Sequence, residues 1–259
     1  MRPPPRDFTD DERAQAVSHT AGGPGAPGVL VLHGFTGNPA SMRAVADAFV
    51  ATDHHVEMPR LPGHGTTLAE LRTTAWGDWA GAADDAYRRL AARAERVVIV
   101  GLSMGGSLAL STALGHPDAR GLVLVNPATC DQPAAVREML LETLEAGIEV
   151  VPRHDSDIAL PGNEELNYEG TPLRQLLSLL DDGLVPMSSR YGELTMPLLL
   201  FTSHQDHVVD PADSVHLAAE YGGPVDHRWL ARSYHVATQD YDRDDIIAAA
   251  LEFVADVCA

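Results

Sequence analysis

Cysteine is scarce and lysine is absent in this 259-residue sequence. Cys130 and Cys258 are too few for a disulfide framework or for a metal site built from thiolates. All 18 basic residues are arginines, against 37 acidic residues, and the formal net charge is −19. We therefore expect neither nucleic acid nor an anionic membrane surface as a standing partner. The same charge fits a halophilic protein or simply a very soluble one.

Long apolar runs are also missing. No stretch reaches 18 consecutive apolar residues, so we expect no membrane-spanning helix and no stable membrane insertion. Residues 1–8 lack the apolar core of a signal peptide, which predicts a cytoplasmic location. The 12 histidines are scattered rather than spaced as metal ligands, and we expect no metal and no organic cofactor. The sequence leaves the oligomeric state open.

A strand, a tight turn and a helix are predicted around Ser103. The apolar run Val97–Val100 is typical of a strand buried on both faces. Gly101–Gly105 then matches G-x-S-x-G, and Ser107–Leu114 predicts a helix that ends at Gly115. In such a unit the glycines let two backbones approach closely, while a strained serine exposes its hydroxyl at the tip. The helix start directs free N–H groups at the same tip. Ser103 is therefore predicted to be a nucleophile.

Buried-type strands alternate with helices on both sides of this unit. Further strands are predicted at Gly28–Leu32, His54–Met58, Gly121–Val125, Pro197–Thr202 and Val225–Leu230. Further helices are predicted at Ala40–Ala51 (capped by Asn38), Thr74–Ala94, Pro211–Tyr221 and Tyr241–Val257. This order predicts an α/β fold with a mainly parallel central sheet flanked by helices.

Two regions depart from this alternation. Residues 1–27 are rich in proline, glycine and charge, and predict a loose N-terminal arm with Ala16–Thr20 as a candidate edge strand. Residues 128–193 predict short helices at Ala134–Ala146 and Pro172–Leu180, with Glu149–Val151 as the only doubtful strand. An insertion of this size above a parallel sheet predicts a cap, or lid, over an active site. The expected division is therefore arm 1–27, first core part 28–127, cap 128–193 and second core part 194–259.

The partners of the serine are expected late in the chain. A serine hydroxyl needs an adjacent base that is itself oriented by an acid. Asp206 and Asp210 both follow a predicted strand, but Asp210 directly precedes Pro211 and is placed to cap a helix. Asp206 is therefore the predicted acid. His235 lies between the last strand and the last helix, where the base belongs in this chain order. His204 and His207, which flank Asp206, are expected on the surface.

Two backbone donors are needed for the negative charge that develops during acyl transfer. One is the N–H of Met104, the residue after the predicted nucleophile. The other is expected from the loop after the first core strand, where the Phe35 N–H is the candidate. The alternative is that His33-Gly34 forms an ordinary strand-ending turn. His64 is expected only to pack in its own loop.

With these motifs, the chain resembles the α/β-hydrolase carboxylesterases, and among them most closely the bacterial monoacylglycerol lipases. The resemblance covers roughly residues 25–257. It is most specific over Ser233–Thr238 with Asp240–Asp242, and it also rests on His33–Pro39, Pro59–Thr66, Gly101–Gly106, Asp206–Val209 and Glu165–Pro172.

The resemblance implies a catalytic triad of Ser103, Asp206 and His235, with the N–H groups of Phe35 and Met104 as oxyanion hole. It also implies that Glu165 lies at the polar end of the pocket, beside a glycerol headgroup. The expected reaction is hydrolysis of a small-molecule ester, such as a monoacylglycerol, through an acyl-enzyme. The cap matches poorly between Gln132 and Asp157, so no acyl-chain length is implied.

Other activities of the same scaffold stay open at this point. A general short- or medium-chain carboxylesterase and an acyltransferase would use the same triad, as would a carbon–carbon hydrolase or a perhydrolase. A catalytically inactive binding module is disfavoured because all three triad members are present. A dehalogenase is excluded because it needs aspartate in place of Ser103. The alternative for Glu165 is one more surface charge on an acidic chain.

Overall fold

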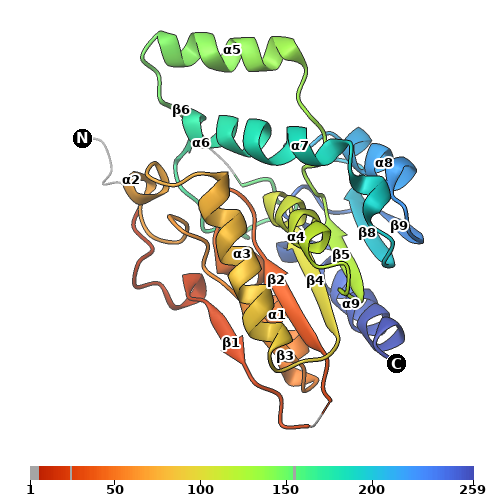
Figure 1. Cartoon of the computed structure of the whole chain (residues 1–259). Coiled ribbons are helices and arrows are strands. Elements are labelled where there is room, and N and C mark those ends of the chain that lie inside the picture. The colour runs from red at the N-terminus through yellow and green to blue at the C-terminus, as the bar shows by residue number, and fades with distance from the viewer. Residues whose placement is uncertain (1–5, 24, 154–155) are drawn as a thin grey trace.

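A seven-stranded sheet forms the centre of the computed structural model, which describes residues 6–23, 25–153 and 156–259 (Figure 1). The strand order is β1-β3-β2-β4-β5-β8-β9, and all neighbours are parallel except β1 and β3. The strands are β1 (Val17–His19), β2 (Gly28–Leu32), β3 (His55–Met58), β4 (Val97–Leu102), β5 (Gly121–Val125), β8 (Leu198–Ser203) and β9 (Val225–Leu230).

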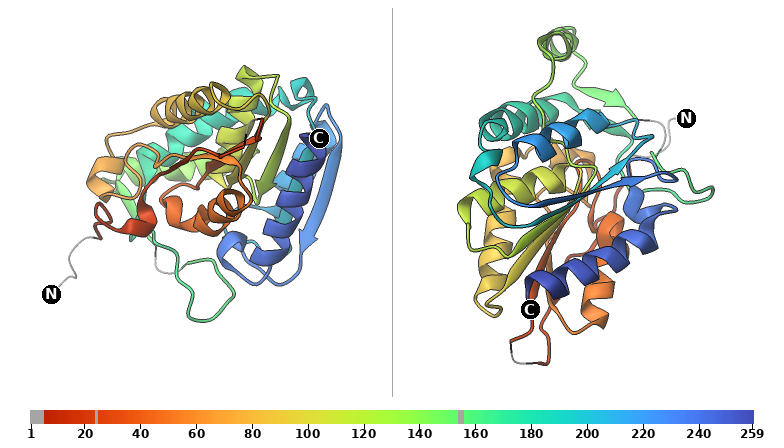
Figure 2. Two further views of the ribbon diagram at one scale, coloured as in Figure 1. Left: turned by 90° about the horizontal axis from the view of Figure 1, so that it is seen from below. Right: turned by 90° about the vertical axis from the view of Figure 1, so that its right-hand side faces the viewer.

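Helices cover both faces of this sheet, as the right-hand view of Figure 2 shows. Helices α3, α4 and α8 pack on one face, and α1 and α9 pack on the other. The core helices are α1 (Arg43–Ala51), α2 (Leu68–Leu71), α3 (Trp76–Ala91), α4 (Met104–Gly115), α8 (Pro211–Glu220) and α9 (Arg243–Val257), with short 3-10 turns η1 (Glu12–Ala14), η2 (Pro39–Met42) and η5 (Ala237–Gln239).

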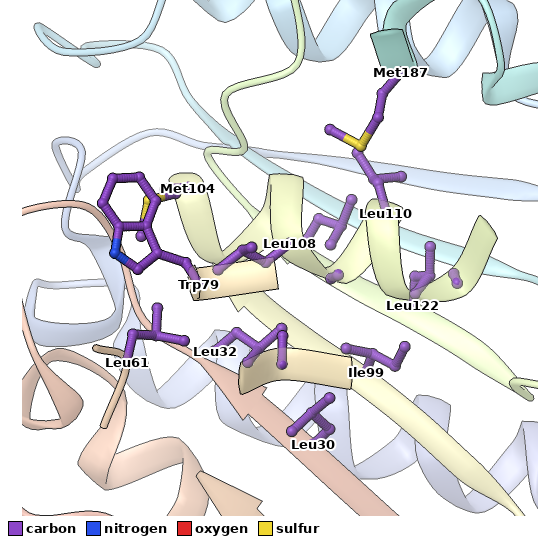
Figure 3. Packing of buried hydrophobic residues seen from close by; sticks show 14 of the residues in the cluster. Leu30, Leu32, Leu61, Trp79, Ile99, Met104, Leu108, Leu110, Leu122 and Met187 are labelled. Atoms are coloured by element: carbon purple, nitrogen blue, oxygen red, sulfur yellow. The ribbon is translucent and has the colours of Figure 1, made fainter. Parts of the chain in front are cut away.

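The two covered faces explain why the central strands are apolar along their whole length. Alternate side chains of a strand point to opposite faces, so each strand supplies two cores. Leu30 packs in one core with Trp79 and Leu108 (Figure 3), whereas its neighbours Val29 and Val31 pack in the other. All five residues of β2 are buried.

The insertion between β5 and β8 lies beyond the carboxyl ends of the central strands, with α5 outermost (Figure 1). It contains α5 (Ala134–Glu145), the antiparallel pair β6 (Val150–Pro152) and β7 (Gly170–Pro172), and the consecutive helical segments α6 (Leu173–Ser178), η3 (Leu179–Leu184, π-helical) and α7 (Val185–Ser188), followed by η4 (Tyr191–Glu193). Across the described residues, no helix is long and apolar enough to cross a bilayer.

Most core elements agree with the sequence prediction. β2, β5 and β9 begin and end at the predicted residues, and the candidate edge strand in the arm is β1. Asn38 caps its helix as expected through a hydrogen bond from the Ala40 N–H, although the first turn is 3-10. The doubtful strand in the insertion is β6, and its partner β7 was not predicted.

The prediction of a loose arm is wrong for its described part. Phe8 and Ala14 are buried, and the Phe8 N–H donates to the Thr66 carbonyl oxygen (2.9 Å). Isolated apolar residues among prolines and charges have no periodicity, so the sequence gives no sign of this packing. Residues 1–5 and 24 of the predicted arm lie outside the described residues.

We expect Gly101→Ala to lower the free energy of unfolding by about 3 kcal/mol, because its Cβ would overlap the carbonyl oxygen of Gly105. Gly81→Ala is the matched control. Gly81 lies within α3 and has nothing within 4 Å of an added Cβ, so alanine should stabilise the protein by up to about 1 kcal/mol. Urea unfolding of both variants measures the difference. A Gly101→Ala protein as stable as the wild type would contradict the close approach.

Candidate active site

Ser103 occupies a strained turn between β4 and α4. Its backbone has φ 56° and ψ −123°, a left-handed conformation that non-glycine residues seldom adopt. Such strain costs on the order of 1–3 kcal/mol and persists only where the surroundings impose it. Here the surroundings are neighbouring backbone segments, which Gly101 and Gly105 allow to approach closely. A Cβ on Gly105 would overlap the backbone of Leu32 in the neighbouring strand. The structure therefore confirms the predicted turn.

Asp206 and His235 meet beyond the carboxyl ends of β8 and β9. Their side chains are 2% and 5% exposed, and Asp206 Oδ2 lies 2.8 Å from His235 Nδ1. The second carboxylate oxygen accepts the N–H groups of Val208 (2.8 Å) and Val209 (2.9 Å). Because an ionised carboxylate only accepts, this contact places the imidazole proton on Nδ1 and leaves Nε2 as an acceptor.

Ser103 and His235 line one cavity of about 370 Å³. Among the described residues, no hydrogen bond joins the Ser103 hydroxyl to His235.

Asp210, the alternative acid, has a different position. Its side chain accepts the Ala212 N–H at 2.9 Å and caps α8, as the sequence predicted. The structure thus brings Asp206 to His235, and Asp210 to a helix end. His227 lies on the edge strand β9, and its Nε2 is 2.8 Å from Thr202 Oγ1.

The loop after β2 passes directly beside Ser103. A Cβ on Gly34 would lie 3.3 Å from Ser103 Cβ, so only glycine fits there without a shift. In the described part of the chain, the N–H groups of Phe35 and Met104 have no hydrogen-bond partner. Two free donors beside the serine are what an oxyanion hole needs.

His33 holds this loop in place. Its Nε2 lies 3.2 Å from the Leu61 N–H and its Nδ1 lies 3.0 Å from the Gly34 carbonyl oxygen. Burial lowers the pKa of His33 to about 4, so the ring is neutral and can accept on one side while it donates on the other. The His64 ring packs beside it, with centroids 5.3 Å apart, and also against Trp79 of α3 at 5.4 Å, so its packing extends beyond its own loop.

The cavity has an apolar wall and a polar end. The apolar wall comes mainly from the insertion, with Val136, Leu140, Leu176, Leu179, Leu180 and Leu184. Arg153 hydrogen-bonds to Thr36 and Glu165, and these three residues form the polar end. Gln132, Thr171, Asp210 and Asp213 add further polar side chains to the lining. Such a division suits a ligand with an aliphatic chain at one end and hydroxyl groups at the other.

Glu165 is 7% exposed, so it is not a surface charge and that alternative is wrong. Its Oε2 lies 3.3 Å from an Arg153 guanidinium nitrogen and accepts from the Asn167 amide at 3.1 Å. Arg153 also donates to Thr36 Oγ1 at 3.1 Å, next to Phe35. No role was predicted for Arg153, because it stands in a polar stretch without periodicity.

Comparison with known proteins gives consistent matches. Residues 26–242 match the family described as "Serine aminopeptidase, S33". The chain is 39% identical over 237 residues to a thermostable monoacylglycerol lipase of Bacillus sp. (strain H-257), which covers 89% of this chain and 91% of that relative. It is 25% identical over 234 residues to a carboxylesterase of Bacillus subtilis (strain 168), covering 89% and 93%.

A solved structure reported with the metagenome-derived lipolytic enzymes LipS and LipT superposes with a TM-score of 0.87. It is 32% identical and covers 95% of this chain and 98% of the other. Together with the mostly parallel sheet, these matches confirm the α/β-hydrolase fold predicted from the sequence.

The two aspartates can be separated by substitution. We expect Asp206→Asn to lower kcat about 10⁴-fold, because the amide no longer holds His235 in the required tautomer. Asp210→Asn should leave kcat within a few-fold, because asparagine caps a helix about as well as aspartate. Steady-state hydrolysis of a p-nitrophenyl ester measures both. The reverse pattern would make Asp210 the acid.

Proposed function

Because the chain belongs to the family described as Serine aminopeptidase, S33, within the α/β hydrolases, we propose that Ser103, His235 and Asp206 are the catalytic triad of a carboxylic ester hydrolase. The supporting observation is the buried Asp206–His235 pair, whose histidine lines the same cavity as the strained Ser103. The family description names a peptidase, whereas the two relatives described above are named for ester hydrolysis.

The proposed reaction proceeds through an acyl-enzyme. Ser103 Oγ attacks the ester carbonyl while His235 Nε2 takes the hydroxyl proton and then gives it to the leaving alcohol. Asp206 keeps the proton on His235 Nδ1 and stabilises the imidazolium that forms. The N–H groups of Phe35 and Met104 stabilise the oxyanion. Water, activated by His235, then releases the acid and restores Ser103.

Monoacylglycerol is the proposed substrate. The leucine-rich wall suits an acyl chain, and the buried carboxylate of Glu165 can accept a hydrogen bond from a glycerol hydroxyl, directly or through water. The 39% identical relative supports this assignment. The second candidate function is that of a general carboxylesterase, which the 25% identical relative favours.

Ser103→Ala should abolish ester hydrolysis, with a loss of about 10⁴- to 10⁶-fold in kcat, because it removes the hydroxyl that forms the acyl-enzyme. Thermal unfolding should stay close to that of the wild type, since the turn depends on the glycines. A fluorophosphonate should label the wild type once, at Ser103. Activity above about 1% of wild type in Ser103→Ala would exclude the mechanism.

Glu165→Ala should lower kcat/KM for a monoacylglycerol about 10- to 100-fold, the loss expected for a hydrogen bond to a charged group worth about 1.5–3 kcal/mol. Hydrolysis of the p-nitrophenyl ester of the same acid should change little, because its leaving group has no hydroxyl to bind. Glu164→Ala, at the exposed neighbouring position, is the control. An equal loss on both substrates would indicate a distorted cavity, and no loss would favour the general carboxylesterase.

A further inference from the structure

The insertion places one carboxylate between the loop of Asp206 and the loop of His235. Asp157 Oδ2 accepts the backbone N–H groups of His235 (3.0 Å) and His207 (3.1 Å). Asp157 Oδ1 lies 2.7 Å from His207 Nδ1, and the Asp157 carbonyl oxygen accepts the Val236 N–H at 3.0 Å. The Asp157 side chain is only 15% exposed, although it belongs to a polar stretch of the insertion. Asp157 therefore links the insertion to the loop of Asp206 and to the loop of His235.

The backbone of His235 is held from both sides as a result. On the other side, Asn126 Nδ2 donates to the His235 carbonyl oxygen at 2.8 Å. Asn126 follows β5 and has φ 44°, so its own backbone is constrained. With the N–H bound to Asp157 and the carbonyl bound to Asn126, the imidazole of His235 has little freedom to shift relative to Ser103.

His207 completes the link on the side of the acid. It follows Asp206 directly, and its ring packs edge-on against Tyr234, with centroids 4.7 Å apart and planes at 86°. Tyr234 directly precedes His235. His207 thus contacts the base loop through its ring and through Asp157, although 59% of its side chain is exposed.

We propose that Asp157 is a positioning residue of the triad, which fixes the loop of the base against the loop of the acid from within the insertion. The proposal rests on the triad described under Proposed function. Asp157 is not itself among the residues that line the cavity, and its side chain acts on the triad through the backbone N–H of His235. Displacement of a catalytic group by about 1 Å can cost on the order of 100-fold in rate. Loss of the Asp157 side chain should therefore lower kcat and leave substrate binding unchanged.

The test compares two substitutions of Asp157 on a p-nitrophenyl ester. Asp157→Ala removes every side-chain acceptor and should lower kcat about 10- to 100-fold, with KM within about twofold. Asp157→Asn keeps an acceptor oxygen for the backbone N–H groups and should retain kcat within about fivefold. Asp131→Ala, at an exposed position of the same insertion, is the matched control and should behave as wild type.

A double-mutant cycle with His207 separates positioning from general destabilisation. His207→Ala should lower kcat about 3- to 10-fold, and Asp157→Ala/His207→Ala should lose less than the product of the two single losses, because part of the effect of His207 passes through Asp157. If the two single losses in kcat multiplied in the double variant, Asp157 and His207 would act independently, and this result would overturn the proposed link between them. Should Asp157→Ala not fold, Asp157→Ser and His207→Ala carry the same test.

The outcomes also distinguish this inference from the function on which it rests. Wild-type kcat in Asp157→Ala, with Ser103→Ala inactive, overturns the positioning role alone. A rise in KM that accounts for the whole loss in kcat/KM also overturns it, because it indicates a change in the cavity. Activity in Ser103→Ala overturns the proposed triad and the inference with it.

Discussion

The close approach of two backbones beneath Ser103 is the constraint on which the rest of the structure depends. β4 ends and α4 begins within one residue, and neither Gly101 nor Gly105 has room for a side chain. The parallel register then brings the carboxyl ends of β2, β8 and β9 to the same edge of the sheet. Ligand-binding residues in open parallel sheets gather at this edge. Residues as distant in sequence as Gly34 and His235 therefore line one cavity with Ser103.

Much of this arrangement could be predicted because its signals are local. A buried parallel strand is apolar throughout, and the turn glycines stand at fixed offsets from Ser103. The choice of Asp206 over Asp210 also followed from a local rule, since a residue before Pro211 that can cap a helix has a structural task. In each case a few adjacent residues carried the information, and the structure places the residues as expected.

Residues whose contacts are entirely tertiary could not be predicted. Arg153 and Asp157 stand in a polar stretch where no periodicity distinguishes a buried charge from a solvated one. Phe8 is likewise isolated among polar residues, yet it is buried against Tyr168, with ring centroids 6.0 Å apart. His207 was expected on the surface, and its ring is largely exposed, but its Nδ1 contact with Asp157 depends on a residue 50 positions away.

The carboxylates that shape the histidine loop show how a chain without lysine uses its acidic residues. Asp240 accepts the Tyr234 N–H and Asp242 accepts the Ser233 N–H, both at 2.9 Å. Burial opposes ionisation of Asp242, but hydrogen bonds from Ser233 and Arg232 outweigh it and lower its pKa. A carboxyl group with a lowered pKa in the folded state stabilises the fold above its ordinary pKa of 3.8, and this contribution is lost as the pH falls below that value. The loop that carries His235 therefore depends on an ionised carboxylate that takes no part in the proposed chemistry.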